Sequence, residues 1–268
     1  MEQGSLIHIS VVPICNPTKV DCLTEFLDAT CPVCKLQKAT LFERVEDWQY
    51  ARCSACDFVF TYPHPEQSYL NTLYTQQSNS SDGKIGQSSS RKRRAFLRAL
   101  SLRKYLKGGK KALDIGCGAG FIVESMRQVG ADAYGFDINE ASINFAKANY
   151  PKSHFYLNSY DTISEFPDFF DFIYSSEVIE HVSELDAYLE LIVKVSRPKA
   201  YVYVTTPDFS SDKRPANVLE WGEFAPPEHI QFFSEKNLSI LFDRYGFNFV
   251  KRFKDKKTGL KALFQRAD

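Results

Sequence analysis

The sequence has no excess of charge of either sign. Its 33 lysines and arginines are balanced by 33 aspartates and glutamates, so no overall field draws the chain to nucleic acid or to a membrane surface. It also lacks an apolar run near the roughly 18 residues that a membrane-spanning helix needs. Residues 1–5 lack the basic start of a secretion signal. Together these absences predict a soluble, cytoplasmic protein.

The sequence also gives no sign of disulfide pairing. Its seven cysteines are an odd number, and without a secretion signal they disfavour a disulfide framework. Four of them form two Cys-x-x-Cys turns, with 18 residues between the turns: Cys31, Cys34, Cys53 and Cys56. Four thiolates at this spacing can converge on a tetrahedral structural zinc ion and leave no position for water. The pattern predicts a zinc ribbon, with residues 43–50 and 51–53 as the hairpin arms between the two turns; a redox pair or unconnected core cysteines are the alternatives.

A glycine-rich turn at residues 113–120, Leu-Asp-Ile-Gly-Cys-Gly-Ala-Gly, predicts a cofactor site. Gly116 and Gly118 let the backbone turn close to a ligand, and Gly120 lets the following helix pack tightly. The spacing differs from the dinucleotide fingerprint, because the third glycine comes one residue early and bulky Phe121 follows it. The turn therefore argues against NAD.

A second expected strand, residues 133–137, ends in a carboxylate. Asp137 lies 21 residues beyond Gly116. An acidic residue about 20 positions after the glycine turn is placed to accept both ribose hydroxyls. The turn and this carboxylate together predict a cofactor that contains a ribose.

From Lys111 onward, expected strands and helices alternate, which is typical of a parallel sheet with helices on both faces. Further strands are expected at 154–158, 170–176 and 200–206. Helices are expected at 121–129, at 140–149 with Asn139 as cap, at 185–195 with Ser183 as cap, and from Ser234 to a stop at Gly246. Residues 247–253 and 260–266 are expected to form a closing hairpin.

The pattern Asp-x-Gly-x-Gly-x-Gly at 114–120 resembles the first motif of the class I S-adenosylmethionine-dependent methyltransferases. Ser-Glu-Val-Ile-Glu-His-Val at 176–182 is similar to the signature of a subfamily that includes ubiquinone-biosynthesis O-methyltransferases and bacterial enzymes acting on sugars and other small metabolites. Thr-Thr-Pro-Asp at 205–208 and Pro-Pro-Glu-His-Ile-Gln-Phe-Phe-Ser at 226–234 match the same subfamily, and the cysteine ribbon resembles an N-terminal module of many bacterial members.

This resemblance covers residues 31–266. It implies an α/β, Rossmann-like class I methyltransferase sheet, with parallel strands closed by a C-terminal antiparallel hairpin and a small N-terminal zinc ribbon. Two positions depart from the pattern. Arg-Pro-Lys-Ala at 197–200 replaces a Pro-Gly-Gly turn, which we expect to alter only that turn, and no Gly-Asp closes the third strand, which leaves the adenine contacts with the least support.

The implied cofactor is S-adenosylmethionine, and its candidate contacts follow the carboxyl ends of the strands, where ligands of parallel sheets bind. Asp114 is expected near the cationic amino group, Asp137 at the ribose and Ile138 against the adenine. The other candidates are the backbone of Gly116, Cys117 and Gly118, the polar Asn158 and Ser159 after the third strand, and Ser176 beside the sulfonium.

Methyl transfer from a sulfonium needs mainly alignment, with a base when the acceptor is a hydroxyl. His229, His181 and Glu177 are the candidates for that base, because histidine titrates near neutral pH and all three lie in segments expected to border the acceptor. The alternative for each histidine is a packed or solvated residue. Segment 217–229, rich in aromatic residues and proline, is expected to cover the acceptor.

The chain is expected to divide into an N-terminal segment with the zinc ribbon (1–65), a helix with a flexible linker or lid (66–90) and the methyltransferase domain (91–268). Residues 76–90 are low in complexity and fit either a disordered linker or a mobile lid. Residues 91–111 carry ten basic residues and no acidic one. They fit either a solvated helix face or a patch that contacts phosphate.

These features favour methyl transfer to a small-molecule acceptor, such as a sugar, a polysaccharide precursor or a secondary metabolite, with oxygen as the preferred acceptor atom. RNA methylation is the first alternative, since zinc-bearing ribosomal RNA guanine methyltransferases have a similar layout; the balanced charge argues against it. A cofactor-binding interaction protein without catalysis is the second alternative.

Overall fold

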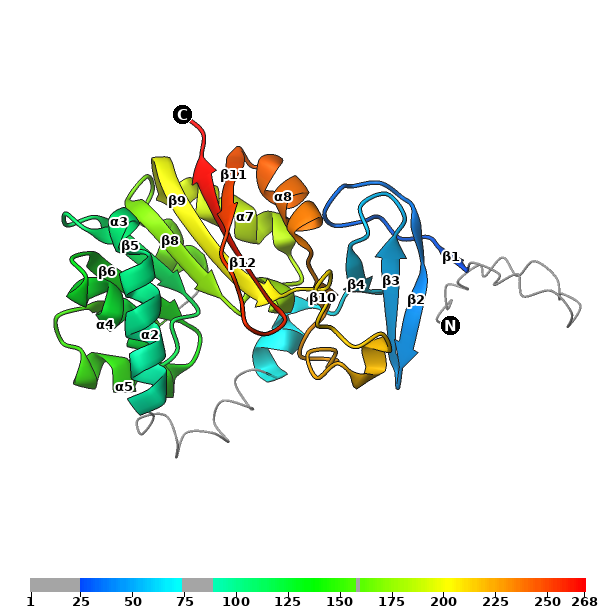
Figure 1. Cartoon of the computed structure of the whole chain (residues 1–268), viewed down its shortest axis with the longest axis horizontal. Helices are drawn as coiled ribbons and strands as arrows, with labels where there is room; N and C mark the ends of the chain where they lie inside the picture. The colour runs from blue at the N-terminus through cyan, green and yellow to red at the C-terminus, as the bar shows by residue number, and fades with distance from the viewer. Residues whose placement is uncertain (1–24, 74–88, 158–159) are drawn as a thin grey trace, which may run out of the picture.

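The computed structural model describes residues 25–73, 89–157 and 160–268, which form two sheets (Figure 1). The expected linker or lid at 76–90 lies outside the described residues, apart from Ser89 and Ser90, which begin α2. The short helix expected after residue 65 is present at 67–73. Within the described ranges, no helix combines the length and the apolar character needed to cross a membrane.

The larger sheet has seven strands in the order β11-β12-β9-β8-β5-β6-β7. Its parallel part consists of β5 (Lys111–Ile115), β6 (Asp132–Asp137), β7 (His154–Leu157), β8 (Phe170–Ser176) and β9 (Ser196–Pro207). The antiparallel strands β11 (Phe247–Arg252) and β12 (Gly259–Arg266) close it beside β9. The expected fold class, with its C-terminal hairpin, is confirmed.

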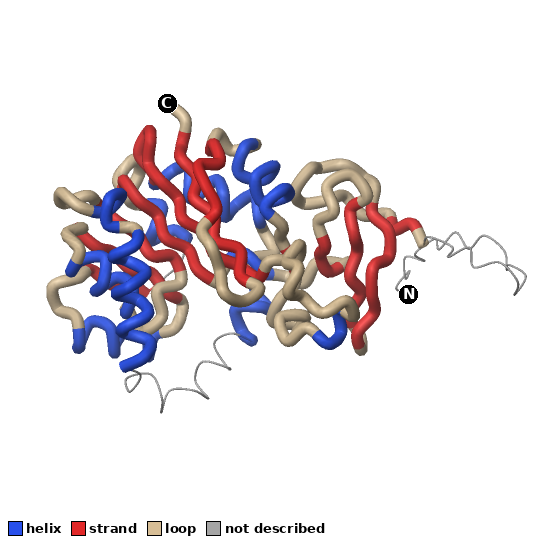
Figure 2. Tube along the Cα trace, viewed as in Figure 1, coloured by secondary structure: helices blue, strands red, loops and turns tan. Residues whose placement is uncertain are grey.

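Helices cover both faces of this sheet (Figure 2). On one face α2 (Ser89–Ser101), α3 (Arg103–Leu106), α4 (Phe121–Gln128) and α5 (Glu140–Asn149) share an apolar cluster with Ala112. On the other face α6 (Tyr160–Ser164), α7 (Leu185–Val195) and α8 (Glu235–Asp243) share a cluster with Leu113 and Ile115. Neighbouring residues of a strand point to opposite faces, so β5 supplies both clusters.

The expected helix caps are right at two positions and wrong at one. Asn139 caps α5 by accepting a hydrogen bond from the Ser142 N–H at 2.7 Å, and Ser234 forms a capping box with Asn237 at the start of α8. Ser183 does not cap α7. Its N–H and hydroxyl both donate to the Gln67 Oε1, so the side chain instead ties this loop to the helical segment 67–73.

The strand β9 begins four residues before its expected start, at Ser196 instead of Ala200. Its register against β8 shifts between Phe170 and Phe172, which oppose Ser196 and Tyr201. Residues 197–200 therefore form a bulge inside the strand, with Lys199 in the left-handed region at φ 65°. The departure from the family's Pro-Gly-Gly turn is thus accommodated as a bulge.

The smaller sheet has five strands in the order β1-β2-β3-β4-β10. They are β1 (Phe26–Leu27), β2 (Ala39–Val45), β3 (Trp48–Cys53), β4 (Val59–Thr61) and β10 (Gln231–Phe232). The hairpin arms expected at 43–50 and 51–53 are wrong, because the chain turns at Glu46, where φ is 52°. The turn therefore falls inside the first expected arm.

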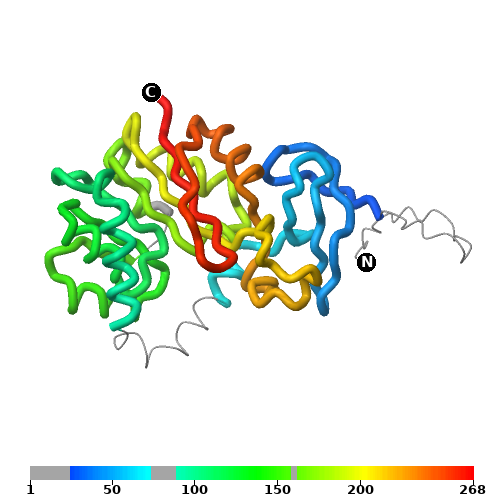
Figure 3. Tube along the Cα trace, viewed as in Figure 1, coloured from blue at the N-terminus to red at the C-terminus, as the bar shows by residue number. Residues whose placement is uncertain are grey.

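The fifth strand of the smaller sheet comes from far along the chain. In β10, Gln231 opposes Phe60 and Phe232 opposes Val59 of β4. Aromatic side chains from the segment after β9, Trp221 among them, pack against β3, and Figure 3 shows this gold segment beside the blue strands. The smaller sheet is therefore completed by a strand from the C-terminal part of the chain.

The two sheets also share an apolar core. Phe58 is fully buried, and its ring lies 4.9 Å from that of Phe233, measured between centroids. Both belong to the cluster that covers β5, α7 and α8. Arg244, just after α8, donates to the carbonyl oxygens of Pro32 and Val33, so polar contacts tie the same surfaces together.

The shared core predicts that both sheets unfold together. Phe58→Ala should lower the free energy of unfolding by about 3–5 kcal/mol, because a large buried ring leaves a cavity. Phe26→Ala, at a ring that is 79% exposed, should change it by less than about 0.5 kcal/mol. Urea titrations followed by far-ultraviolet circular dichroism and by fluorescence should give one coincident transition. Two separate transitions would contradict a shared core.

Candidate functional site

The glycine turn after β5 has the backbone shape that its sequence predicts. Gly116, Gly118 and Gly120 have φ values of 77°, 49° and 76°, all in the left-handed region that favours glycine. A Cβ atom added at Gly116 would lie 2.6 Å from Cγ2 of Val178. The turn is therefore closely packed from behind and presents bare backbone to a ligand.

Two buried carboxylates lie at this turn, one in β5 and one at the end of β6. Asp137 accepts hydrogen bonds from the Gly118 N–H at 2.7 Å and the Asn139 N–H at 2.8 Å. Burial raises the pKa of Asp137, and these backbone donors oppose that rise. Asp114 is fully buried, and burial, followed by the charge of Asp137, raises its pKa well above the ordinary value. Asp137 thus holds the turn in place from within.

A cavity of about 490 Å³ opens beside the turn. Five of the expected site residues line it: Asp114, Gly116, Cys117, Ser176 and Glu177. Gly118 in the turn, and Asp137 and Ile138 at the end of β6, do not line this cavity. Asn158 and Ser159 lie outside the described residues. The cavity is thus bounded by the ends of β5 and β8.

A second cavity, of about 220 Å³, adjoins the first and shares Arg98, Ser176 and Glu177 with it. At this junction the Ser176 hydroxyl lies 2.6 Å from that of Thr205, and Thr205 Oγ1 donates to Glu177 Oε1 at 2.8 Å. Glu177 has a φ of 55°, which is uncommon outside glycine. Strained backbone of this kind is common at functional sites, and the strained residue here, Glu177, lines both cavities.

The two candidate histidines lie together, although they are far apart in the sequence. His181 ends the short helix η2 (Ile179–His181) and His229 precedes β10, and their ring centroids are 4.8 Å apart. Each ring places Nδ1 2.6 Å from a backbone carbonyl oxygen, that of Glu228 for His181 and that of Glu223 for His229. Burial, followed by the charge of His229, lowers the pKa of His181 to about 4.

Sequence analysis missed three residues that shape this site. Arg98 of α2 is half-buried and donates to the hydroxyls of Tyr203 and Tyr174 at 3.0 and 3.4 Å. This arginine of the basic segment therefore contacts the sheet instead of lying free in solvent. Tyr50 of the N-terminal sheet donates to the His229 carbonyl oxygen at 2.8 Å. Glu180 is fully buried between the two catalytic candidates of its own segment. Only the run of arginines in 91–98 could have signalled the first of these.

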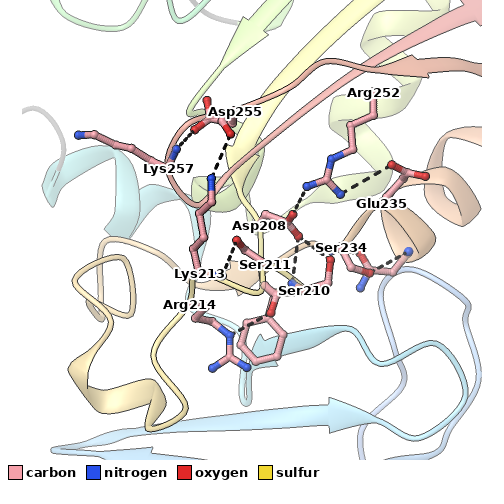
Figure 4. Close-up of polar contacts among 12 residues, drawn as sticks. Asp208, Ser210, Ser211, Lys213, Arg214, Ser234, Glu235, Arg252, Asp255 and Lys257 are labelled. Atoms are coloured by element: carbon pink, nitrogen blue, oxygen red, sulfur yellow. Dashed lines mark hydrogen bonds and ion pairs between the residues drawn. The ribbon is translucent and has the colours of Figure 1, made fainter.

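The segment that leads from β9 to His229 is fixed by the polar contacts of Figure 4. Buried Asp208 pairs with Arg252 of β11 and accepts bonds from the N–H and the hydroxyl of Ser210. Lys213 donates to the carbonyl oxygens of Asp255 and Lys256 in the closing hairpin. These contacts anchor the start of the segment on the closing hairpin, and Glu223, further along the segment, lines the second cavity.

The four cysteines of the expected ribbon meet in the smaller sheet. Cys31 and Cys56 have sulfur atoms 3.6 Å apart, and Cys34 and Cys53 have theirs 3.5 Å apart. All four thiols are free, and their sulfur atoms lie within 4.8 Å of one another. Four sulfurs around a zinc ion at about 2.3 Å would stand roughly 3.8 Å from each other. The thiol geometry therefore fits a tetrahedral metal.

Comparison with known proteins defines the class. A family model described as a methyltransferase domain matches residues 88–252, which is more than half of the chain, so the chain belongs to the methyltransferase family. Its fold is that of S-adenosylmethionine-dependent methyltransferases. Magnesium protoporphyrin IX methyltransferase from Synechocystis PCC 6803, solved with bound SAH, aligns with a TM-score of 0.58 over 75% of this chain and 100% of that chain, at 15% identity.

Curated relatives match a shorter segment. The ubiquinone biosynthesis O-methyltransferase of Bradyrhizobium diazoefficiens is 27% identical over 156 residues, which is 52% of this chain and 62% of the relative. The enzyme of the same name from Rhodopseudomonas palustris (strain TIE-1) is 32% identical over 123 residues, or 42% of this chain and 49% of the relative. The match thus spans less than two thirds of the length of these curated relatives.

The glycine turn gives a test of the cofactor site. Gly116→Ala should weaken S-adenosylmethionine binding about tenfold, because the new methyl group meets Val178 and a left-handed non-glycine residue costs about 1–2 kcal/mol. Gly222→Ala is the control, since a Cβ there meets nothing within 4 Å. Calorimetric titration measures both variants. Equal affinities for the two would remove the turn from the binding site.

Proposed function

We propose that this chain transfers the methyl group of S-adenosylmethionine to a hydroxyl of a small molecule. The observation that carries the proposal is the pair of adjoining cavities, which meet at Ser176 and Glu177. One cavity lies against the glycine turn, and the other leads away toward the closing hairpin. A methyl donor and an acceptor can therefore meet end to end at the carboxyl edge of the sheet.

The cofactor supplies a methyl carbon bonded to a positively charged sulfur. In the reaction an acceptor oxygen forms a bond to that carbon, the carbon–sulfur bond breaks with its electron pair going to sulfur, and the acceptor proton leaves. The chain supplies alignment and a site for that proton. Alignment is the larger of these two contributions, because the leaving group is already activated.

The proposed contacts with the cofactor are those that the sequence predicts. Asp114 favours the amino group and Asp137 the ribose, and Ile138, which is 37% exposed, offers an apolar surface for the adenine. The further proposed contacts are the backbone of Gly116, Cys117 and Gly118, together with Asn158, Ser159 and Ser176. The buried carboxylates and the bare glycine backbone fit a cationic amino acid end.

Three groups are proposed to receive the acceptor proton. Glu177 lines both cavities and accepts a hydrogen bond from Thr205. His181 and His229 donate their Nδ1 protons to backbone carbonyls, which leaves the Nε2 lone pair of each neutral ring able to accept a proton. The acceptor itself is proposed to be small, consistent with a second cavity of about 220 Å³ and with the names of the curated relatives.

A calorimetric titration with S-adenosylmethionine, followed by an assay of methyl transfer to a panel of sugars and phenols, tests this function. We expect binding and SAH release with at least one small acceptor. If RNA is methylated instead, and is bound with a steep salt dependence, the acceptor is RNA and not a small molecule. A folded protein that does not bind S-adenosylmethionine would contradict the function itself.

His229→Ala should leave cofactor binding intact and slow turnover at least tenfold, because general base catalysis typically contributes about 10²–10⁴-fold. His154→Gln is the control, since His154 begins β7 at the far end of the strand and pairs with Asp132. Turnover rates with the identified acceptor measure both. An unchanged rate for His229→Ala would remove this residue from the proton path.

The four cysteines are proposed to hold one structural zinc ion, which stabilises the smaller sheet and takes no part in the chemistry. Elemental analysis of protein purified without chelator should give about one zinc per chain. Cys53→Ser should lower the zinc content and the midpoint of thermal unfolding, whereas Cys117→Ser, at the glycine turn, should keep the zinc. Full zinc occupancy in Cys53→Ser would contradict the four-thiolate site.

A further inference from the structure

The second cavity, of about 220 Å³, is lined almost entirely by polar side chains. Of the described residues that line it, only Pro207 and Gly259 lack a polar side chain. Pockets for aromatic or apolar ligands are lined mainly by apolar side chains. Charged groups that lose water against such a ligand, and gain no partner, are costly. The cavity therefore favours a polyhydroxylated acceptor over an apolar phenol.

The strand register shows how this cavity runs along the sheet. Ser176 of β8 opposes Thr205 of β9, and Thr205 opposes Lys261 of β12. Paired residues of neighbouring strands point to the same face, so the three side chains form one row, and all three line the cavity. Two strand spacings separate the ends of the row. An acceptor whose hydroxyl meets the methyl donor at Ser176 can therefore extend about 10 Å toward the closing hairpin.

Arg98 brings to this cavity a positive charge that its neighbours compensate only in part. It donates to the hydroxyls of Tyr203 and Tyr174 at 3.0 and 3.4 Å. Burial raises the pKa of both tyrosines, so both hydroxyls are neutral at physiological pH. Asp255 attracts the guanidinium, but this carboxylate is itself paired with Lys261. The guanidinium can therefore still bind an anion.

Lys257 brings a second positive charge to the cavity, from the turn of the closing hairpin. Its backbone N–H donates to the Asp255 carboxylate at 2.6 Å, whereas its side chain extends away from that carboxylate (Figure 4). In the ranges that the structure describes, the Lys257 ammonium group forms no ion pair with a carboxylate. Two cations of the cavity wall thus lack a dedicated counter-ion among the described residues.

The carboxylates of the cavity do not cancel these two charges. Asp255 is paired with Lys261. The Glu223 side chain is 46% exposed, so water screens its charge. Glu177 lines both cavities and therefore lies at their junction, where the reacting hydroxyl is expected beside Ser176. An anionic group of the acceptor is therefore favoured away from that junction, toward the hairpin.

We propose that Arg98 and Lys257 bind a carboxylate or phosphate group of the acceptor, and that the acceptor is a polyhydroxylated anion such as a sugar acid or a sugar phosphate. Charge-assisted hydrogen bonds to an oxyanion are roughly twice as strong as neutral ones. Holding the anionic group also selects the hydroxyl that faces the methyl donor. The role of this group in an acceptor rests on the proposed methyl transfer, whereas the binding of an oxyanion does not.

The carboxylate of S-adenosylmethionine is the other anion that could reach Arg98, because Arg98 lines both cavities. Lys257 separates the two possibilities, since it lines the second cavity and not the first. A residue that binds the acceptor should leave the affinity for the cofactor unchanged. The neighbouring Lys256 is exposed like Lys257 but does not line the cavity, so it provides a matched control.

Titration with inorganic phosphate, followed by phosphorus NMR with and without bound SAH, tests the anion site. We expect a dissociation constant of about 1–10 mM. Lys257→Gln and Arg98→Gln should each weaken phosphate binding about tenfold, because each removes a charged donor. Lys256→Gln and Arg103→Gln, at exposed side chains, should bind phosphate as the unmodified protein does. Calorimetry should show unchanged S-adenosylmethionine affinity for Lys257→Gln, which also shows that this variant is folded.

The proposal is overturned if phosphate does not bind or if Lys257→Gln binds it unchanged. It is also overturned if Lys257→Gln weakens S-adenosylmethionine binding, since the anion would then be the cofactor's own carboxylate. If Arg98→Gln fails to fold, Lys257→Gln decides. Because phosphate binding is read without methyl transfer, a failure of the anion site and a failure of the proposed function are distinguishable.

The transfer assay adds a second readout. An anionic acceptor should be preferred to its neutral counterpart, as in glucose 6-phosphate against glucose, and Lys257→Gln should raise its KM about tenfold with little change in kcat, because the lost contact is made in the ground state as well. Preference for a neutral or aromatic acceptor would contradict the proposal. If no member of the panel is methylated, the phosphate titration decides.

Discussion

The arrangement of this protein depends on the pairing of β10 with β4. Two residues, Gln231 and Phe232, complete the smaller sheet through their backbone, while the Gln231 side chain fixes the turn that carries Glu180 and His181. The same strand begins two residues after His229. One short element thus joins the two sheets and helps to hold the two histidines together, with ring centroids 4.8 Å apart. The amide of Gln231 has no exposure to water, so its bonds are made without competition from solvent.

Much of the larger sheet could be predicted because its signals are local. The strand at 170–176 and the helix at 140–149 with its Asn139 cap have the predicted bounds, since periodicity and capping chemistry act within a few residues. The positive φ values of Gly116 and Gly118 follow from the glycine spacing in the same way. Ser183 was an exception, because a residue 116 positions away in the chain, Gln67, competes for its hydrogen bonds.

What sequence alone could not give are the contacts between distant segments. Nothing in Gln231-Phe232 distinguishes a two-residue strand from a loop, and nothing in β3 indicates that Tyr50 reaches a histidine 179 residues later. In the sequence alone, Glu180 cannot be told from an ordinary exposed acidic residue near Glu177, and only the structure shows that it is buried. Glu177 and His181 could be named as candidate bases from their sequence segment. The burial of Glu180 between them depends on packing that the sequence does not show.

The completion of the smaller sheet by β10 also constrains how the chain can fold during synthesis. The cysteine turns and β4 leave the ribosome first, yet the partner of Phe60 is Gln231, made 171 residues later. Until then β4 presents an unpaired edge, the kind of surface that promotes association between chains. A metal bound early by the four cysteines would hold that edge in a compact form while the rest of the chain is made. The ribbon would then act, before any chemistry occurs, as protection for a nascent chain.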